Sequence, residues 1–171
     1  TRLFGEEFKS RWQPRRRGEG ATEPPSQPEP TIQVEGFEVR ITDAGRYIVT
    51  VVNGKAMPVT VEEYKEQVAA RLVEEAPTPE VFRSCWIEPV KRRELLGRLP
   101  DAGRSALLVQ KLEGMDDYDL YDVLAELGYG QAPRTRTGRA EAFTYKHKSW
   151  LEGLPPAAAA TLMAMAGQFA V

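Results

Sequence analysis

Alternating apolar and polar residues mark the first patterned part of the chain. Phe37, Val39 and Ile41 alternate with charged or polar side chains, and this period of two is typical of a half-buried strand. Residues 43–45 (Asp-Ala-Gly) have turn composition, and a run rich in β-branched residues follows at 47–52. Two neighbouring strands are therefore predicted here.

A hairpin signal follows these two strands. Asn53-Gly54 predicts a tight turn, because both residue types tolerate positive φ. A short third strand at 55–59 would complete a small antiparallel β-meander. Pro58 places this strand at an edge of the sheet, since proline has no backbone N–H to donate to a further strand.

At Thr60 the pattern changes from alternation to the period of a helix. Residues 60–63 (Thr-Val-Glu-Glu) form a capping box, in which Thr60 and Glu63 satisfy each other's free amides. The helix is predicted to run to about Glu75. Tyr64, Val68 and Leu72 lie on one of its faces.

The rest of the chain is predicted to be mostly helical. Thr78-Pro79 starts a helix that breaks at Pro89, because a threonine cap followed by proline is a helix-start pattern. Further helices are predicted at 90–99, 105–112, 118–127 and 137–150, and a last one opens at Pro156.

Helix ends and inward-facing residues follow from the same pattern. Asp116 or Asp117 is predicted to cap the helix at 118–127, and Gly128 to end it. Met165 and Phe169 should face inward together with Leu162. The fold class predicted is mainly α: a helical domain, preceded by the small β-meander, with about eight helical segments on one core. The residues expected to be buried are Trp86, Leu95, Leu96, Leu124, Leu127 and Leu162.

Residues 1–30 differ in composition from the rest. They are rich in proline and charge, which predicts a flexible linker or the tail of an upstream domain, with the helical domain at 31–171. Apolar residues at near-helical spacing between Leu3 and Trp12 are interpreted as the end of that upstream domain, with a short docking helix as the alternative. A segment upstream of Thr1 is expected.

The composition limits the cellular compartments and the classes of partner that are expected. The chain has 171 residues, one cysteine and a net charge of -2. One cysteine excludes a disulfide framework within the chain and fits the reducing cytoplasm. The longest apolar stretch, 155–165, is too short to cross a bilayer, so no membrane partner is expected. The net charge argues against a primary DNA clamp, while a local basic patch stays possible.

Motifs for chemistry are missing. The chain has no phosphate-binding glycine loop and no nucleophile elbow, and Cys85 and His147 are too few for a zinc site. The acidic run at 116–122 lacks the glycine and glutamate that a calcium loop requires. Glu63-Tyr64-Lys65 matches half of a nuclease core but lies on a predicted helix. No catalytic, cofactor-binding or metal residue is therefore predicted.

A basic stretch supplies the candidate interaction residues, Arg134, Arg136, Arg139, Lys146 and Lys148. They could meet nucleic-acid phosphate or an acidic protein surface. They could instead belong to a solvated helix start that pairs with the acidic run inside the chain. Isolated surface pairs contribute little to stability.

The order of several segments along the chain is informative about its family. These segments are Phe82 to Trp86, Arg92 to Leu96, Asp117-Tyr118-Asp119-Leu120, Thr135 to Ala140, and Leu162 to Ala170. With the preceding hairpin, this order resembles the C-terminal domain of type I restriction enzyme R subunits, the EcoEI-type family. The resemblance covers about four-fifths of the chain. Gly138 departs from it, since the family usually has a charged pair between the two arginines.

The resemblance implies a role within a larger protein. The parent would be an ATP-dependent DNA translocase and endonuclease that uses ATP and Mg in upstream domains and works with methyltransferase and specificity subunits. This part of it would be a non-catalytic, cytoplasmic assembly module without a cofactor, and would meet DNA only through the complex. The alternative, drawn from the residues alone, is a direct DNA-binding domain that uses the five basic side chains.

Overall fold

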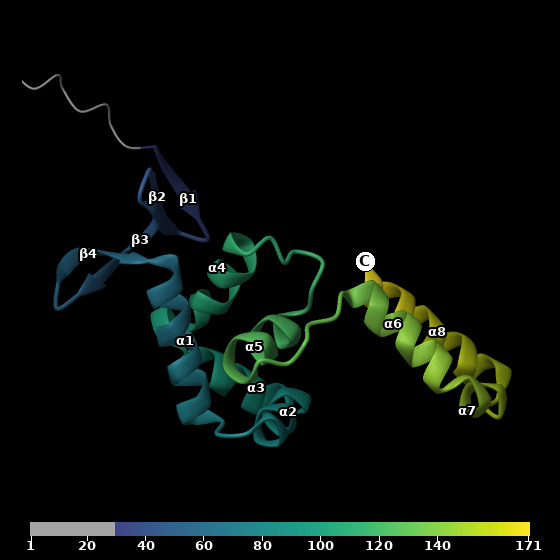
Figure 1. The fold of residues 1–171 in the computed structure, drawn as a ribbon. Coiled ribbons are helices and arrows are strands. Elements are labelled where there is room, and N and C mark those ends of the chain that lie inside the picture. Colours follow the sequence, from purple (N-terminus) through teal and green to yellow (C-terminus); the bar gives the residue numbers. More distant parts are fainter. Residues whose placement is uncertain (1–29) are drawn as a thin grey trace, which may run out of the picture.

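The computed structural model describes residues 30–171 (Figure 1). A four-stranded antiparallel sheet comes first and is followed by helices, which is the predicted fold class. The predictions for residues 1–29 lie outside the described residues. The strands are β1 (Thr31–Val34), β2 (Phe37–Thr42), β3 (Gly45–Val52) and β4 (Lys55–Thr60), in the spatial order β1-β2-β3-β4.

The helices follow in one continuous run after β4. Their bounds are α1 (Val61–Glu75), α2 (Pro79–Ile87), α3 (Pro89–Arg98), the 3-10 turn η1 (Pro100–Gly103), α4 (Arg104–Leu112), α5 (Leu120–Tyr129), α6 (Arg136–Lys146), α7 (Lys148–Glu152) and α8 (Pro156–Ala170).

Tight turns with positive φ build the sheet. Asn53 and Gly54 have φ of 51° and 74°, so the predicted hairpin is confirmed, and β4 with Pro58 lies at an edge as predicted. The prediction of three strands was wrong by one, because Glu35 and Gly36 form a second turn of the same kind, with φ of 50° and 81°. This turn pairs β1 with β2.

One helix connects the sheet to the helical body. The capping box of α1 is confirmed: the Glu63 amide donates to Thr60 Oγ1 at 3.1 Å, and the Thr60 amide donates to Glu63 Oε2 at 3.0 Å. Tyr64, Val68 and Leu72, which were predicted to share one face, are all fully buried. The face of α1 that they form therefore joins the sheet to α3, α4 and α5.

The core lies between the sheet and α1 to α5. Its buried members are Phe37, Val39, Ile48, Val61, Tyr64, Val68, Leu72, Ala76, Phe82, Leu95, Leu99, Ala106, Leu108, Val109, Val123, Leu124 and Ala125. The predicted burial of Leu95 and Leu124 is confirmed. Trp86, Leu96 and Leu127 are only half-buried, because they lie at the margin of this core.

Both ends of α5 differ from the prediction. Asp119, not Asp116 or Asp117, caps the helix by accepting a hydrogen bond from the Tyr121 amide at 2.9 Å. Gly128 does not end the helix, which continues to Gly130, where φ is 64°. The reason is the conformation of each glycine: only Gly130 adopts the left-handed backbone that ends a helix.

Gly128 has a different role, which is close packing of α5 against α1. A Cβ at this position would lie 2.8 Å from Leu72 Cδ2, and Leu72 is fully buried. Gly128→Ala is expected to cost about 1 kcal/mol of stability, since overpacking outweighs the gain in helix propensity. Gly167→Ala in α8 meets nothing within 4 Å and should instead stabilise by up to about 1 kcal/mol. Urea unfolding of both variants measures the difference; stabilisation by both would refute the close approach.

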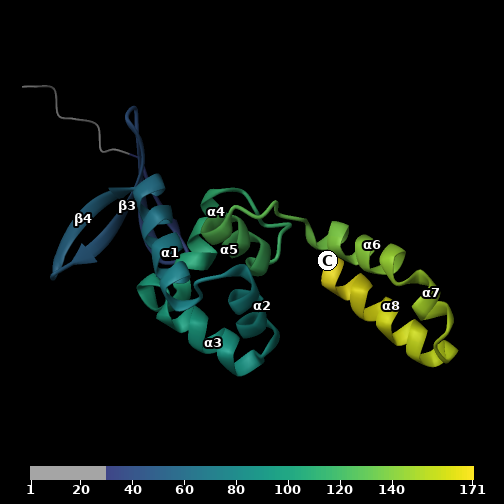
Figure 2. The same cartoon turned by 60° about the horizontal axis from the view of Figure 1, so that its bottom comes forward.

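The three C-terminal helices project from the rest of the molecule as a hairpin (Figures 1 and 2). The predicted helix at 137–150 is interrupted at His147, so that α6 is followed by the short α7, and α8 returns along α6. No residue of α6, α7 or α8 belongs to the core cluster. The prediction that all helices pack on one core was therefore wrong for these three.

The inward positions predicted on α8 were also wrong in part. Leu162 is half-buried, but Met165 is 60% exposed and Phe169 is 39% exposed. The physical reason is that α8 packs mainly along α6, and nearly half of its residues are alanines, which cover little surface. Within residues 30–171, none of the helices has the length and apolar character that crossing a bilayer requires.

Candidate interaction site

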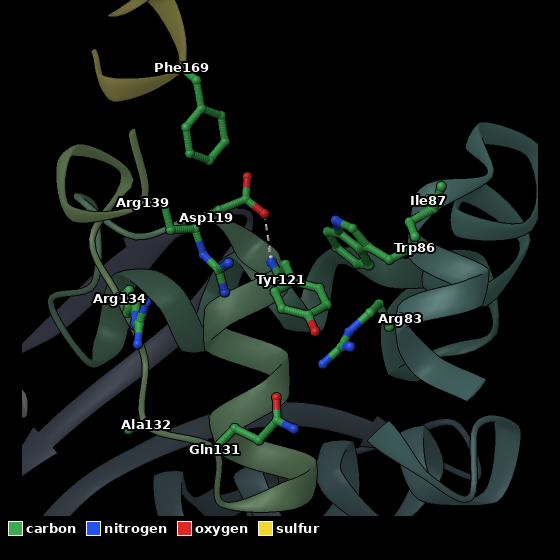
Figure 3. A pocket seen from close by; sticks show the side chains of 10 residues that line it. All are labelled: Arg83, Trp86, Ile87, Asp119, Tyr121, Gln131, Ala132, Arg134, Arg139 and Phe169. Atoms are coloured by element: carbon green, nitrogen blue, oxygen red, sulfur yellow. Dashed lines mark hydrogen bonds between the residues drawn. The ribbon is translucent and has the colours of Figure 1, made fainter. Parts of the chain in front are cut away.

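A recess lies where the C-terminal hairpin joins the helical body, and we call it the arginine recess (Figure 3). It has a volume of about 610 Å³ and receives residues from α2, α5, the loop after α5, α6 and α8. Its lining consists of Arg83, Trp86, Ile87, Asp119, Tyr121, Gln131, Ala132, Arg134, Arg139 and Phe169.

A buried carboxylate holds this junction together. Asp122 of α5 is 1% exposed and accepts hydrogen bonds from Arg139 Nε at 2.6 Å and Arg139 Nη2 at 2.7 Å. Its Oδ1 also accepts a bond from the Arg134 amide at 3.0 Å. The bond to Asp122 raises the pKa of Arg139, because it stabilises the charged guanidinium. One carboxylate thus fixes both the start of α6 and the loop before it.

This ion pair supports, for part of the basic stretch, the alternative in which it pairs with the acidic run inside the chain. The acidic run and the basic stretch do pair, through Asp122 and Arg139. Arg136 contributes differently: its Nη2 donates to the Asp116 carbonyl at 2.5 Å, and its amide donates to the Asp117 carbonyl at 2.9 Å. Two of the five candidate side chains are thereby engaged within the chain.

Aromatic rings form one wall of the arginine recess. Tyr121 stacks on the buried Phe82 with ring centroids 5.1 Å apart, and Trp86 meets Tyr121 edge-on at 5.8 Å. The Arg139 guanidinium lies 5.1 Å from the centroid of the Tyr121 ring. These contacts give the recess a rigid, apolar side next to its charges.

Two guanidinium groups of the recess have no carboxylate partner in the part of the chain that the structure describes. Arg83 and Arg134 are exposed, and among residues 30–171 no carboxylate oxygen lies within 4.0 Å of either side chain. A hydrogen bond with the Tyr121 hydroxyl raises the pKa of Arg83. Asp119 is the acidic lining residue, and its Oδ1 already accepts the Tyr121 amide. The recess therefore presents two cations that an anionic group could bind.

The five predicted interaction residues do not form one patch. Arg134 and Arg139 line the recess, and Arg136 lies beside them at the start of α6. Lys146 is at the opposite end of α6, about 15 Å along the helix axis. Lys148 begins α7, beyond that end. The arginines and the lysines therefore belong to separate surfaces.

Sequence reasoning missed Arg83, Trp86 and Tyr121 as members of a site. Arg83 and Trp86 lie three positions apart on α2, so they share a helix face. That spacing was visible in the sequence. Nothing in it showed that this face would meet α5 and the basic stretch, which begins about 50 residues later.

Residues considered for other chemistry have structural partners. Glu63 caps α1, and Lys65 pairs with Glu113 at 3.1 Å. Cys85 lies on α2 and His147 between α6 and α7, so they are on opposite sides of the junction. No group of three or more His, Cys, Asp or Glu residues that could hold a metal occurs within residues 30–171.

The arginine recess combines an aromatic wall with two guanidinium groups that have no carboxylate partner among residues 30–171. Such a surface can bind a carboxylate or phosphate next to an apolar group. It offers no nucleophile paired with a base. No protein-family model, curated protein or solved structure matches this chain.

Proposed function

We propose that this chain is a non-catalytic assembly module of a type I restriction enzyme R subunit, which attaches the motor to the methyltransferase–specificity core in the cytoplasm. The proposal rests first on the segments that resemble the C-terminal domain of that family. ATP, Mg and DNA cleavage would belong to other domains of the parent protein.

The observation that carries the proposal is the projecting C-terminal hairpin. It joins the body at one end only (Figure 2). Its last helix, α8, has 15 residues and is therefore about 22 Å long. Trp150 is 53% exposed, and Met163, Met165 and Phe169 are exposed as well. Together they make the hairpin rich in exposed apolar side chains, which is typical of protein-interaction surfaces, and methionine adapts well to a partner.

The alternative function, direct DNA binding through the basic stretch, has weaker support. Arg136 and Arg139 are engaged within the chain, and Lys146 and Lys148 lie away from the arginines. A protein that grips DNA aligns its cations along the phosphate backbone. The separation of these side chains does not provide such a row.

A paired titration tests the proposal. The chain is expected to bind the purified methyltransferase–specificity complex without DNA. Its affinity for that complex should fall far less steeply between 50 and 200 mM salt than DNA binding would, because apolar contacts contribute much of it. A DNA-binding mode with five phosphate contacts would instead lose about 500-fold over this range.

Isothermal titration calorimetry with the complex and fluorescence anisotropy with labelled duplex DNA are the two measurements. Binding to the complex alone supports the proposal. Steeply salt-dependent DNA binding without any binding to the complex would establish the alternative in its place.

A further inference from the structure

A second recess continues the arginine recess along the hairpin, and we call it the apolar groove. It has a volume of about 310 Å³ and lies between α6 and α8. Phe143 contributes from α6, and Leu162, Met165 and Phe169 contribute from α8. Arg139 and Phe169 line both recesses, so that one surface runs from the body of the molecule along the hairpin.

The two parts of this surface differ in chemistry. The end at the body carries Arg83 and Arg134, neither with a carboxylate partner among residues 30–171. The end along the hairpin is almost wholly apolar. Leu162, Met165 and Phe169 are three and four positions apart, so they form a single stripe on α8.

We infer that the arginine recess and the apolar groove together bind an acidic–apolar segment of a partner protein, one that places carboxylates at the body end and apolar side chains along the hairpin. This inference rests on the proposed function, because it identifies the docking face of the assembly module. Charge complementarity places the acidic end of the segment at Arg83 and Arg134, since each planar guanidinium can donate two parallel hydrogen bonds to a carboxylate.

The apolar groove favours a protein segment over nucleic acid. Phosphates would use the guanidinium groups of Arg83 and Arg134, but a duplex has no group for the stripe of Leu162, Met165 and Phe169. A helix with apolar residues three and four positions apart would fill such a stripe, which is a common mode of peptide recognition. The acidic end of that helix would then face the two arginines.

The test uses the full chain and two synthetic fluorescein-labelled peptides. One carries glutamates in its first turn and leucines at spacings of three and four; the second has glutamines in place of the glutamates. We expect the acidic peptide to bind at least about tenfold more tightly, equivalent to about one charge-assisted hydrogen bond.

Matched variants assign the binding to this surface. Arg83→Gln combined with Arg134→Gln should weaken the acidic peptide at least about tenfold, for the same reason. Lys146→Gln combined with Lys148→Gln removes the same charge at the far end of α6 and should have less than about a twofold effect. All four side chains are exposed, so these variants should keep the fold.

The apolar part has its own pair of variants. Met165→Gln, in the apolar groove, should weaken both peptides by about fivefold, which corresponds to the loss of roughly one buried methylene group. Met163→Gln is the control, because Met163 lies on the other side of α8, beside Thr144. It should leave both affinities unchanged.

Several outcomes would overturn the inference. They are absence of binding by either peptide at about 1 mM, equal affinity for the two peptides, displacement of the peptide by duplex DNA, and a concentration-dependent dimer whose formation the double arginine variant abolishes. The proposed function fails separately. If the peptide binds as expected but the methyltransferase–specificity complex does not, the docking surface stands and the assembly role is wrong. If the complex binds the double arginine variant as tightly as the unchanged chain, the assembly role stands and this docking surface is wrong.

Discussion

The Arg139→Ala variant is expected to lose about 3 kcal/mol of unfolding free energy. The guanidinium makes two of the three hydrogen bonds to Asp122, whose carboxylate is almost fully buried. Removing it leaves a buried charge with one remaining donor, the Arg134 amide. Loss of one partner of a buried pair costs about 3–5 kcal/mol, and the lower end applies because Arg139 itself is partly exposed.

Urea unfolding of Arg139→Ala and of a matched control, Arg134→Ala, measures this effect. Arg134 holds Asp122 through its backbone amide, and its side chain is exposed. Its truncation should therefore change stability by less than about 0.5 kcal/mol. Equal losses for the two variants would show that the Asp122 pair does not hold the junction.

A double variant tests whether the uncompensated charge of Asp122, rather than lost packing, causes the destabilisation. Asp122→Leu combined with Arg139→Met removes both charges and keeps apolar volume. This variant should be more stable than Arg139→Ala alone, because an uncompensated buried charge is worse than no charge. If the double variant is the less stable of the two, packing rather than charge dominates at this junction.

The Phe82→Ala variant is expected to lose about 4 kcal/mol of unfolding free energy. Phe82 is fully buried and its ring contacts those of Trp86, Tyr121 and Tyr129 at centroid distances of 5.1 to 5.6 Å. Truncating a buried phenylalanine typically costs about 3–5 kcal/mol, since the cavity that remains cannot collapse around rigid rings. The same change removes the support of the aromatic wall of the arginine recess.

Val81→Ala provides the control on the same helix. Val81 precedes Phe82, and its side chain is 42% exposed. Its truncation should cost less than about 0.5 kcal/mol in the same urea experiment. A loss below about 1 kcal/mol for Phe82→Ala would mean that α2 is not held to α5 through this ring.

The order of elements could be predicted from the sequence because its signals are local. The capping box of α1, the threonine and proline that start α2, and the Asn53-Gly54 turn each act within about four residues. The mainly helical fold after a small sheet follows from such signals. Two local features were not predicted: the turn at Glu35-Gly36, and the cap at Asp119, for which Asp116 or Asp117 was expected.

Two glycines at the end of α5 show the difference between a local role and a role that depends on tertiary packing. Gly128 and Gly130 are two residues apart and look alike in the sequence. Gly130 ends α5, whereas Gly128 lets the helix approach Leu72 of α1, more than 50 positions earlier. The second role depends on which surface the helix meets, and no local pattern encodes that.

In the candidate site, too, some features follow from the sequence and others only from the tertiary structure. The sequence by itself determined that an acidic run and a basic stretch exist, and that residues 136 and 139 lie near the start of one helix. Only the tertiary structure decided that Asp122 is buried against Arg139, while Arg83 and Arg134 have no carboxylate partner among residues 30–171. It also decided that Met165 and Phe169 of α8 are exposed. The reason is physical: capping and periodicity act over one or two turns of backbone, but desolvation, ion pairing and the exposure of a helix face depend on distant segments that pack together.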